Sequence, residues 1–345
     1  MWKIPDMRAA VASQPMFGAS AGNDVSQTHV VEIGLSAAIV SIANEQPQVL
    51  VVRHKHAPDA LPFGPFDPLH HRTLESGLRT WVRDQTYLAF DYAEQLYTFG
   101  DRGRHTMRAG EGPRVVSVGY LALTRAKDPL QARDSAWGKW YDYFPWEDWR
   151  GGKPALIEGL IGPALHRFVA SSADRSERQR REARVRLCFA LGGVRWDEER
   201  VLERYELLYE AGLVDEALHD GRMQDDAVLP RPPLGAGMQF DHRRILATAI
   251  ARLRGKMKYR PLVFELMPPS FTLLELQRTI EGISGNRLHK QNFRRLVAEQ
   301  GLVERTGKFA RSSRGRPAEL FRFRKEVLGE RHAPGVRLGA RRTGI

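Results

Sequence analysis

The sequence predicts an α+β protein with two folded domains, a mixed-sheet domain in its first half and a basic winged helix near its carboxyl end. Its 345 residues exceed the length of one ordinary domain. Short β-rich runs flank one amphipathic helix within residues 28–125. Helical segments and then two strand-like runs follow a Pro- and Gly-rich linker in the last third of the chain. These patterns place a sheet domain first and a three-helix module with a hairpin second.

The composition is that of a folded globular protein. Hydrophobic residues make up 42% of the chain and charged residues 27%. The single cysteine, Cys188, excludes a disulfide scaffold and a cysteine-based zinc site, and it suits a reducing cytosol. No segment has the apolar length of a signal peptide or of a membrane span. We therefore expect a cytoplasmic protein that does not engage a membrane.

The excess of positive charge is concentrated at the carboxyl end. The formal net charge is +12, and residues 284–345 hold sixteen basic and five acidic side chains, which is +11 of that total. A polyanion is the natural partner for such a segment, because each neutralised phosphate releases condensed counterions. A disordered basic tail is the alternative, and it suits only the end of the chain, since the residues before Arg331 are patterned.

The first half of the chain is expected to form one sheet domain over residues 27–153. A helix is predicted over Thr73–Leu88, whose apolar residues recur at spacings of three and four. Residues 134–150 are rich in aromatic side chains, which we interpret as a cap on a hydrophobic surface; stacking on a base or sugar is the alternative. Strands are expected in four β-rich runs: Val30–Val40, Gln48–Arg53, Glu94–Phe99 and Val115–Leu123.

The other predicted regions follow from composition. The polar N-terminal segment is expected to be flexible. A mostly helical stretch after the sheet domain is interpreted as an insertion. The Pro- and Gly-rich run that follows it is interpreted as the linker. A winged-helix domain and a basic tail complete the chain. The expected boundaries are a flexible N-terminus at 1–26, a helical insertion at 154–220, a linker at 221–238, a winged-helix domain at 239–328 and a basic tail at 329–345.

Three predicted helices and a hairpin define the C-terminal module. Phe240–Met257 is one amphipathic helix. A second helix begins at Thr272, where Glu275 three residues later completes a capping box. The third helix, His289–Gln300, ends at Gly301 in the usual C-terminal position. Two strand-like runs then flank a long basic loop at 306–317, the wing of a winged helix-turn-helix.

The third helix has the face of a DNA-recognition helix. Phe293, Leu296 and Val297 converge on one side, which leaves a polar and basic side free to enter the major groove. The wing contains an Arg-Gly-Arg-Pro run of the kind that enters narrow minor grooves. A winged helix used for protein contacts is the alternative. The predicted DNA-binding residues are Lys290, Gln291, Asn292, Arg294, Arg295, Lys308, Arg311, Arg314 and Arg316.

At several places the chain resembles a known family. The loop Leu61–Pro68 and the helix segment Leu78–Thr86 resemble the Nudix loop–helix–loop. The run Phe264–Gln277, together with Asn292–Arg295 and Arg314–Ala318, is similar to the Nudix-related transcriptional regulators of NAD metabolism. The resemblance implies a Nudix-like α/β/α sandwich with a helical insertion, followed by a C-terminal winged helix-turn-helix.

The Nudix motif is degenerate in this chain. Active Nudix hydrolases use several glutamates on one helix face to hold Mg²⁺ against a diphosphate. Here the Arg-Glu pair of the motif aligns with Thr80-Trp81, and its Glu-Glu pair aligns with Asp84-Gln85. An indole cannot bind a metal ion, and a lone aspartate cannot hold an octahedral one. We therefore expect no catalytic residues, no metal site and little or no hydrolysis.

A degenerate Nudix site can still bind a ligand. The resemblance implies ADP-ribose or a related NAD metabolite as an effector, with no cofactor required. Without a metal, a diphosphate needs cations and amides, and an adenine needs an aromatic ring. The candidate ligand-binding residues are Arg53, Phe63, Arg72, Glu75, Arg79 and Tyr97.

These expectations combine into one hypothesis. A homodimer would place two winged helices on a palindromic double-stranded operator, and the effector would weaken that binding. A rival from another class is an active Nudix pyrophosphatase for ADP-ribose or a nucleotide sugar, with the basic module as an accessory. A nucleic-acid-binding scaffold that has lost its small-molecule site is a third possibility.

Overall fold

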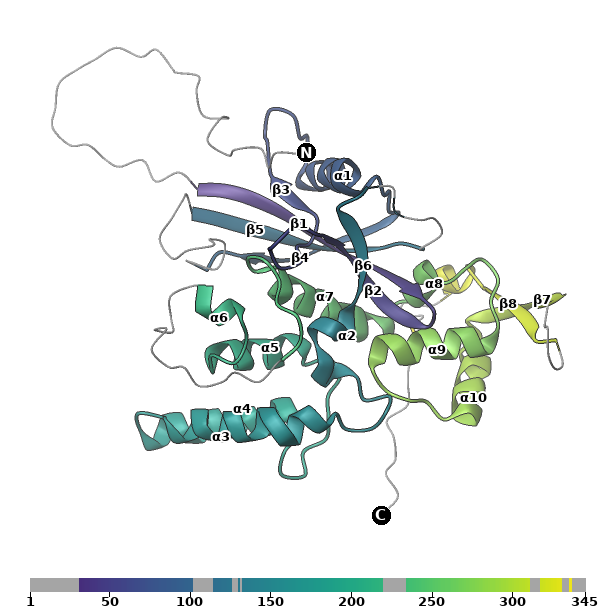
Figure 1. Ribbon diagram of the computed structural model, residues 1–345. Helices are drawn as coiled ribbons and strands as arrows, with labels where there is room; N and C mark the ends of the chain where they lie inside the picture. Colours follow the sequence, from purple (N-terminus) through teal and green to yellow (C-terminus); the bar gives the residue numbers. More distant parts are fainter. Residues whose placement is uncertain are drawn as a thin grey trace, which may run out of the picture. The chain divides into compact units, whose positions relative to one another are not determined.

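The computed structural model describes residues 31–101, 114–125, 130, 132–219, 234–310, 317–330 and 335–336 (Figure 1). All described helices and strands lie in the unit that runs from Val31 to Ile345. The predicted flexible N-terminus, most of the predicted linker and most of the predicted basic tail lie outside the described residues. The predicted wing residues Arg311, Arg314 and Arg316 also lie outside them.

The sheet of the first half is mixed. Its strands run in the order β4-β5-β1-β2-β6, with β3 paired to the first part of β1. The pairing of β1 with β5 is parallel, whereas every other pairing in the sheet is antiparallel. Asn44 and Glu45 join β1 to β2 with φ angles of 49° and 62°, the left-handed pair that a tight hairpin requires. The strands are β1 (Val31–Ala43), β2 (Gln46–Val52), β3 (Phe63–Pro65), β4 (Tyr92–Phe99), β5 (Arg114–Leu123) and β6 (Ser135–Lys139).

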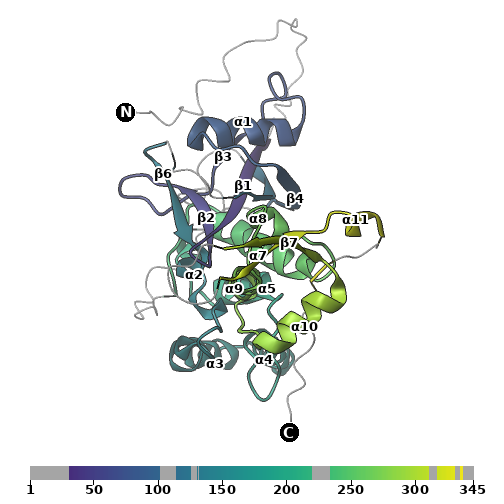
Figure 2. The same ribbon diagram turned by 90° about the vertical axis from the view of Figure 1, so that its right-hand side faces the viewer.

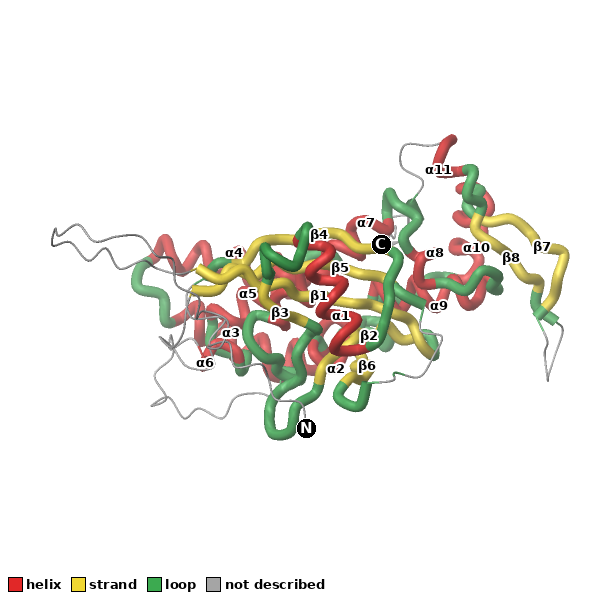
Figure 3. The backbone as a smooth tube through the Cα atoms, turned by 90° about the horizontal axis from the view of Figure 1, so that it is seen from above, coloured by secondary structure: helices red, strands yellow, loops and turns green. Residues whose placement is uncertain are grey.

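Helices cover both faces of this sheet, so the expected α/β/α sandwich is confirmed. Alternate residues of β1 point to opposite faces. Leu35 and Ile39 pack with α1 (Leu74–Thr86), while Ala38 and Val40 belong to the core on the other face. Figure 3 shows α1 lying across the strands. Both cores are fully buried, which fixes the strand register because a one-residue slip would exchange the two faces.

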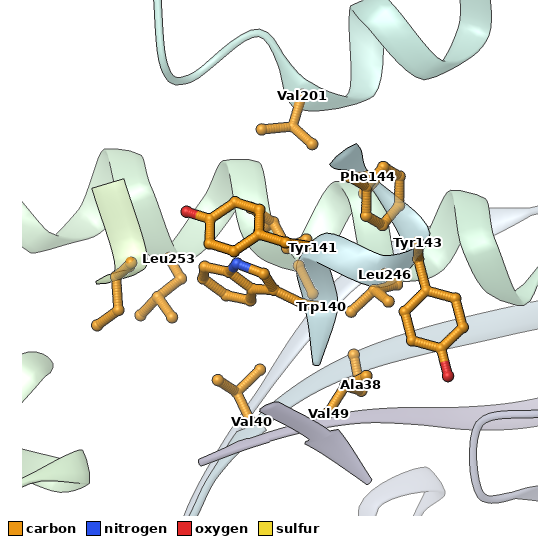
Figure 4. Close-up of a cluster of buried hydrophobic side chains, with 14 of the residues drawn as sticks. Ala38, Val40, Val49, Trp140, Tyr141, Tyr143, Phe144, Val201, Leu246 and Leu253 are labelled. Carbon is orange, nitrogen blue, oxygen red and sulfur yellow. The ribbon is translucent and has the colours of Figure 1, made fainter. Parts of the chain in front are cut away.

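The aromatic segment after β6 lies inside the second core. It forms α2 (Trp140–Tyr143) and the short 3₁₀ helix η1 (Pro145–Glu147). Figure 4 shows Trp140 close to Val40 of the sheet and near Leu253 of the helix α7. Trp140 and Trp146 are both fully buried. The cap on a hydrophobic surface that the sequence predicts is therefore a central part of the core.

The helix α7 (His242–Met257) differs from its expected place. The amphipathic pattern assigned it to the winged helix, but it packs on the sheet and against α5. An added Cβ at Gly119 of β5 would lie 3.0 Å from Ile245, so sheet and helix are in close contact. The helix also contacts α9. It is thus shared by the sandwich and the winged helix, while the remaining domain boundaries stay predictions.

The stretch predicted as a helical insertion is helical in the structure. Asp174 caps α4 by accepting a hydrogen bond from the Glu177 backbone N–H. The insertion joins the core through α5, which packs on α7. Its helices are η2 (Ile157–Ile161), α3 (Gly162–Ala170), α4 (Arg175–Phe189), α5 (Val201–Glu210) and α6 (Glu216–His219).

The last third forms the expected helices and hairpin. The predicted capping box is present, because Thr272 and Glu275 exchange side-chain to backbone hydrogen bonds at the start of α9. Gly301 ends α10 with a φ of 56°, as predicted. A bridge between Phe271 and Phe321 ties the start of α9 to the hairpin. The elements are α8 (Val263–Leu266), α9 (Leu273–Ser284), α10 (Lys290–Gln300), β7 (Val303–Phe309), β8 (Glu319–Phe323) and α11 (Val327–Glu330).

One buried carboxylate connects these parts. Glu147 is 1% exposed and lies between the guanidinium groups of Arg204 on α5 and Arg254 on α7. Arg204 Nη2 donates to Glu147 Oε2 at 3.0 Å, and Arg254 Nη1 donates to the same oxygen at 2.6 Å. Arg254 Nε also donates to the carbonyl oxygen of Ile283 on α9 at 2.8 Å. Sheet domain, insertion and winged helix therefore meet at one ion cluster.

The Glu147→Gln variant should lose about 3–5 kcal/mol of unfolding free energy, because two buried guanidinium groups would keep their charge without a counter-charge. Urea unfolding followed by circular dichroism measures the change. The matched control is Glu158→Gln, which removes an exposed carboxylate paired with Lys153 and should leave the midpoint unchanged. Equal midpoints for the two variants would contradict this role for Glu147.

Candidate functional site

The helix α10 presents its predicted polar face to solvent. Phe293 and Val297 are 2% and 3% exposed, so they anchor the helix to the winged-helix core. Arg295 forms a surface ion pair with Glu299 at 2.9 Å, one helical turn further on. A free face of this kind has the shape and donor groups that enter a major groove. The predicted contact residues that share this exposed face are Lys290, Gln291, Asn292, Arg294 and Arg295.

The hairpin β7–β8 has the predicted place of a wing. Its register shifts between Arg305 and Phe309, and Gly307 there has a φ of 72°, a conformation that favours glycine. Lys308 lies exposed on the hairpin. Arg322 on β8 pairs with Glu304 on β7 at 2.6 Å. The hairpin thus lies beside α10 (Figure 2), and Lys308 is one of its exposed residues.

A groove of about 840 Å³ runs between α9, α10 and the hairpin. Three arginines that line it are not among the DNA-binding residues predicted from the sequence: Arg278, Arg287 and Arg305. Arg278 was missed because it lies within the amphipathic helix α9, and Arg287 because it lies in the short turn. The short turn between the two predicted helices could have indicated these arginines, since it brings α9 and the turn beside the first residues of α10.

The helix α1 carries the segment that the sequence aligns with the Nudix motif, and Trp81 stands where that alignment predicts a glutamate. A Cβ added at Gly64 of β3 would lie 2.2 Å from the Trp81 ring, so the indole packs directly on the glycine backbone. The indole Nε1 donates to the carbonyl oxygen of Pro65 at 2.8 Å. The Trp81 ring therefore ties α1 to β3.

The other motif positions also have structural partners. Gln85 accepts a hydrogen bond from the Phe63 backbone N–H at 3.1 Å and donates to the Phe63 carbonyl oxygen at 2.6 Å. Asp84 pairs with its neighbour Arg83 at 3.0 Å. Within the described part of the chain, no three His, Cys, Asp or Glu side chains lie close enough to hold a metal ion. Among these motif positions Asp84 supplies a carboxylate, whereas Trp81 supplies an indole and Gln85 an amide.

The structure brings together two of the six predicted ligand-binding residues. Glu75 and Arg79 form an ion pair on α1 at 2.8 Å. Arg79 also donates to the carbonyl oxygen of Phe90 at 2.6 Å, and its guanidinium lies 4.4 Å from the Phe90 ring centroid. Burial, and then the charge of Glu75, raise the pKa of Tyr120 on β5. Glu75 and Arg79 therefore lie together on α1, next to Phe90.

The other four candidates lie on separate elements. Arg53, after β2, pairs with Asp59 at 3.3 Å. The ring of Phe63, on β3, packs edge-on against Phe240 at 5.3 Å and His242 at 5.0 Å. Arg72 is exposed before α1. Tyr97, on β4, is 63% exposed and contacts Phe99. Their role in binding stays a prediction.

The winged helix has a known counterpart. Residues 263–323 match the family model described as the NrtR DNA-binding winged helix domain. This segment is therefore similar to that domain family. The chain is also 46% identical over 86 residues to the "ADPR responsive transcriptional repressor NtrR" of Acinetobacter baylyi. That match covers 25% of this chain and 34% of the relative, so the chain matches about a third of that protein's length.

Two solved structures from Shewanella oneidensis are similar to the chain. NrtR complexed with a 27mer DNA is 21% identical, with 86% of this chain and 95% of that chain covered and a TM-score of 0.46. The NUDIX domain of NrtR complexed with ADP ribose is 22% identical, with 35% of this chain and 80% of that chain covered and a TM-score of 0.30.

None of the helices described for this chain combines the length and apolar character that a membrane span requires.

The contact between Trp81 and Gly64 can be tested with a double-mutant cycle. Gly64→Ala alone should lose about 1–3 kcal/mol of unfolding free energy, because the added methyl group would overlap the indole. In a Trp81→Leu background the same substitution should lose much less, since the overlapping ring is gone. Urea unfolding of the four proteins gives the coupling energy. An equal loss in both backgrounds would show that the indole does not lie on Gly64.

Proposed function

We propose that the chain is a DNA-binding transcriptional repressor whose Nudix-like domain senses ADP-ribose or a related NAD metabolite. The observation that carries the proposal is the exposed Gln- and Arg-rich face of α10 within an NrtR-type winged helix. The name of the Acinetobacter relative supports the choice of ADP-ribose. The protein would act in the cytoplasm and would need no further cofactor.

The proposed DNA contacts divide into two kinds. Arginines bind guanine through two hydrogen bonds, and Asn or Gln binds adenine in the same way, so Gln291, Asn292, Arg294 and Arg295 would read bases in the major groove. Cationic groups that reach the backbone fix the register without reading sequence. Lys290 and Lys308 would bind phosphates, and the wing arginines Arg311, Arg314 and Arg316 would enter the minor groove.

A two-fold dimer would place two such helices on a palindromic operator. Successive half-sites on one side of a duplex lie roughly 34 Å apart, so both recognition helices must keep that spacing. A bound effector that changes the spacing would separate one helix from its half-site. A coupling of about 1–3 kcal/mol is enough for regulation, and we expect the effector to weaken DNA binding.

The sensing site would lie in the Nudix-like domain, with Glu75 and Arg79 on α1 and Phe63 beside Phe240 and His242. Its candidate ligand residues are those predicted from the sequence: Arg53, Phe63, Arg72, Glu75, Arg79 and Tyr97. Binding without turnover is the expected behaviour, because Trp81 and Gln85 occupy motif positions that hold metal ligands in active enzymes. Both side chains are engaged by β3 and by the residues next to it.

Substitutions on α10 and on the wing should differ in their effect on DNA binding. Arg294→Ala or Arg295→Ala should cost about 1–3 kcal/mol on the selected operator and relax the preference at one base position. Lys308→Ala should weaken all duplexes alike and reduce the salt dependence by about one phosphate contact. Selection from random duplexes, followed by titration at several salt concentrations, measures both effects. Unchanged operator affinity in all three variants would disprove the proposed recognition surface.

Incubation with ADP-ribose and Mg²⁺ separates a sensor from an enzyme. We expect a rise in the unfolding temperature without turnover, because a ligand at 100 times its Kd stabilises the folded state by about 2.7 kcal/mol. Chromatography of the nucleotide detects any hydrolysis. Brisk turnover would instead identify a pyrophosphatase. A protein with neither response would fit a DNA-binding scaffold.

A further inference from the structure

The turn between α9 and α10 is built around a second buried carboxylate. Glu281 is 2% exposed and uses both oxygens. Its Oε1 accepts hydrogen bonds from the Leu288 backbone N–H and from the Gln277 side-chain amide, each at 2.9 Å. Its Oε2 accepts from Arg287 at 2.8 Å and from Arg278 at 3.4 Å. One carboxylate thus fixes the turn and two arginines together.

The arginines keep exposed surface although they are held. The side chain of Arg278 is 34% exposed and that of Arg287 is 52% exposed. The two guanidinium groups share the Glu281 carboxylate, and Arg278 also lies 3.8 Å from the Glu45 carboxylate, so these four side chains together carry no net charge. A guanidinium bound on one side still offers N–H donors on another, and its planar fork suits phosphate oxygens. The two arginines therefore present guanidinium surface in a fixed geometry.

The groove beside α10 concentrates such charges. It is lined by five cationic side chains and two carboxylates. Lys290 and Arg294, from the first turns of α10, stand on one side, and Arg305 of β7 contributes from the hairpin. The cations that share the groove are Arg278, Arg287, Lys290, Arg294 and Arg305, and the carboxylates are Glu281 and Glu319.

We propose that this groove seats the phosphate backbone of DNA next to the recognition helix, with Arg278 and Arg287 as phosphate ligands and Glu281 as the residue that positions them. The proposal rests on the proposed DNA-binding function and extends it, because neither arginine belongs to the recognition face of α10 or to the wing. A polyanion fits the groove because its net charge is positive and its guanidinium groups are already oriented. Contacts of this kind would strengthen binding to any duplex sequence.

The test uses the full chain and a duplex of random sequence, with affinity measured over a series of salt concentrations. Arg287→Gln and Arg278→Gln should each lower the slope of log affinity against log salt by about 0.9, the value for one lost phosphate contact. The matched control is Arg252→Gln, which removes the same charge from α7, where Arg252 pairs with Glu94 outside the groove. The control should leave the slope unchanged.

Glu281→Gln tests the positioning role of Glu281, because charge and positioning change the DNA affinity in opposite directions. A pure charge effect would strengthen DNA binding, because the variant is more positive. Loss of positioning should instead weaken binding and lower the slope, although the net charge rises. Thermal unfolding of the same samples reports whether each variant is folded, and the two arginine variants replace side chains that are themselves partly exposed.

The outcomes separate this proposal from the proposed function. If Arg278→Gln and Arg287→Gln match the Arg252→Gln control while Lys308→Ala lowers the slope, the groove holds no phosphate and the winged helix still binds DNA. The same result would leave the groove to another partner, such as an acidic peptide. If the parent protein shows no salt-dependent binding to duplex DNA, the proposed function itself fails.

Discussion

The arrangement of this protein depends on the carboxylate of Glu147. A buried carboxylate is stable only when hydrogen bonds and opposite charges replace its water. Glu147 obtains both from Arg204 and Arg254, which reach it from two different helices. Arg204 also binds the carbonyl oxygens of Cys188 and Asp197, and Arg254 binds that of Glu198. The ion cluster therefore places the insertion on the core.

The same cluster sets the position of the helix-turn-helix. Arg254 binds the carbonyl oxygen of Ile283 at 2.8 Å, and the Trp149 backbone N–H donates to the carbonyl oxygen of Gly285 at 2.8 Å. Tyr141 Oη donates to the carbonyl oxygen of Gly282 at 2.7 Å. Arg254, Trp149 and Tyr141 thus all donate to carbonyl oxygens at the C-terminal end of α9. A movement of the aromatic segment would have to move α9, and α10 follows it through the short turn.

The hairpin β1–β2 contacts the other side of this junction. An added Cβ at Gly282 would lie 2.8 Å from the carbonyl oxygen of Glu45, so the helix backbone and the hairpin turn touch. Arg278, one of the groove arginines, lies 3.8 Å from the Glu45 carboxylate. The first half of β1 contacts α1, whereas its last residues lead into this turn. One strand therefore runs from the α1 face of the sheet to the turn that touches α9.

Local signals in the sequence predicted much of this fold, whereas long-range contacts could not be predicted. The capping box at Thr272, the end of α10 at Gly301 and the buried face of α10 each depend on neighbouring residues. The place of α7 does not, because an amphipathic stripe shows that a helix is half-buried without showing what buries it. Glu147 was visible only as an acid among aromatics, since its partners Arg204 and Arg254 lie far along the chain.

The degenerate motif illustrates the same limit at the candidate site. The alignment predicted that Trp81 and Gln85 bind no metal, but it could not show what they do instead. Both fasten β3 and the residue after it to α1, Trp81 through Gly64 and Pro65 and Gln85 through both backbone groups of Phe63. These contacts fix β3 against α1. Since Arg79 is already engaged by Glu75 and Phe90, a diphosphate there must either displace that ion pair or draw its charge from other cations.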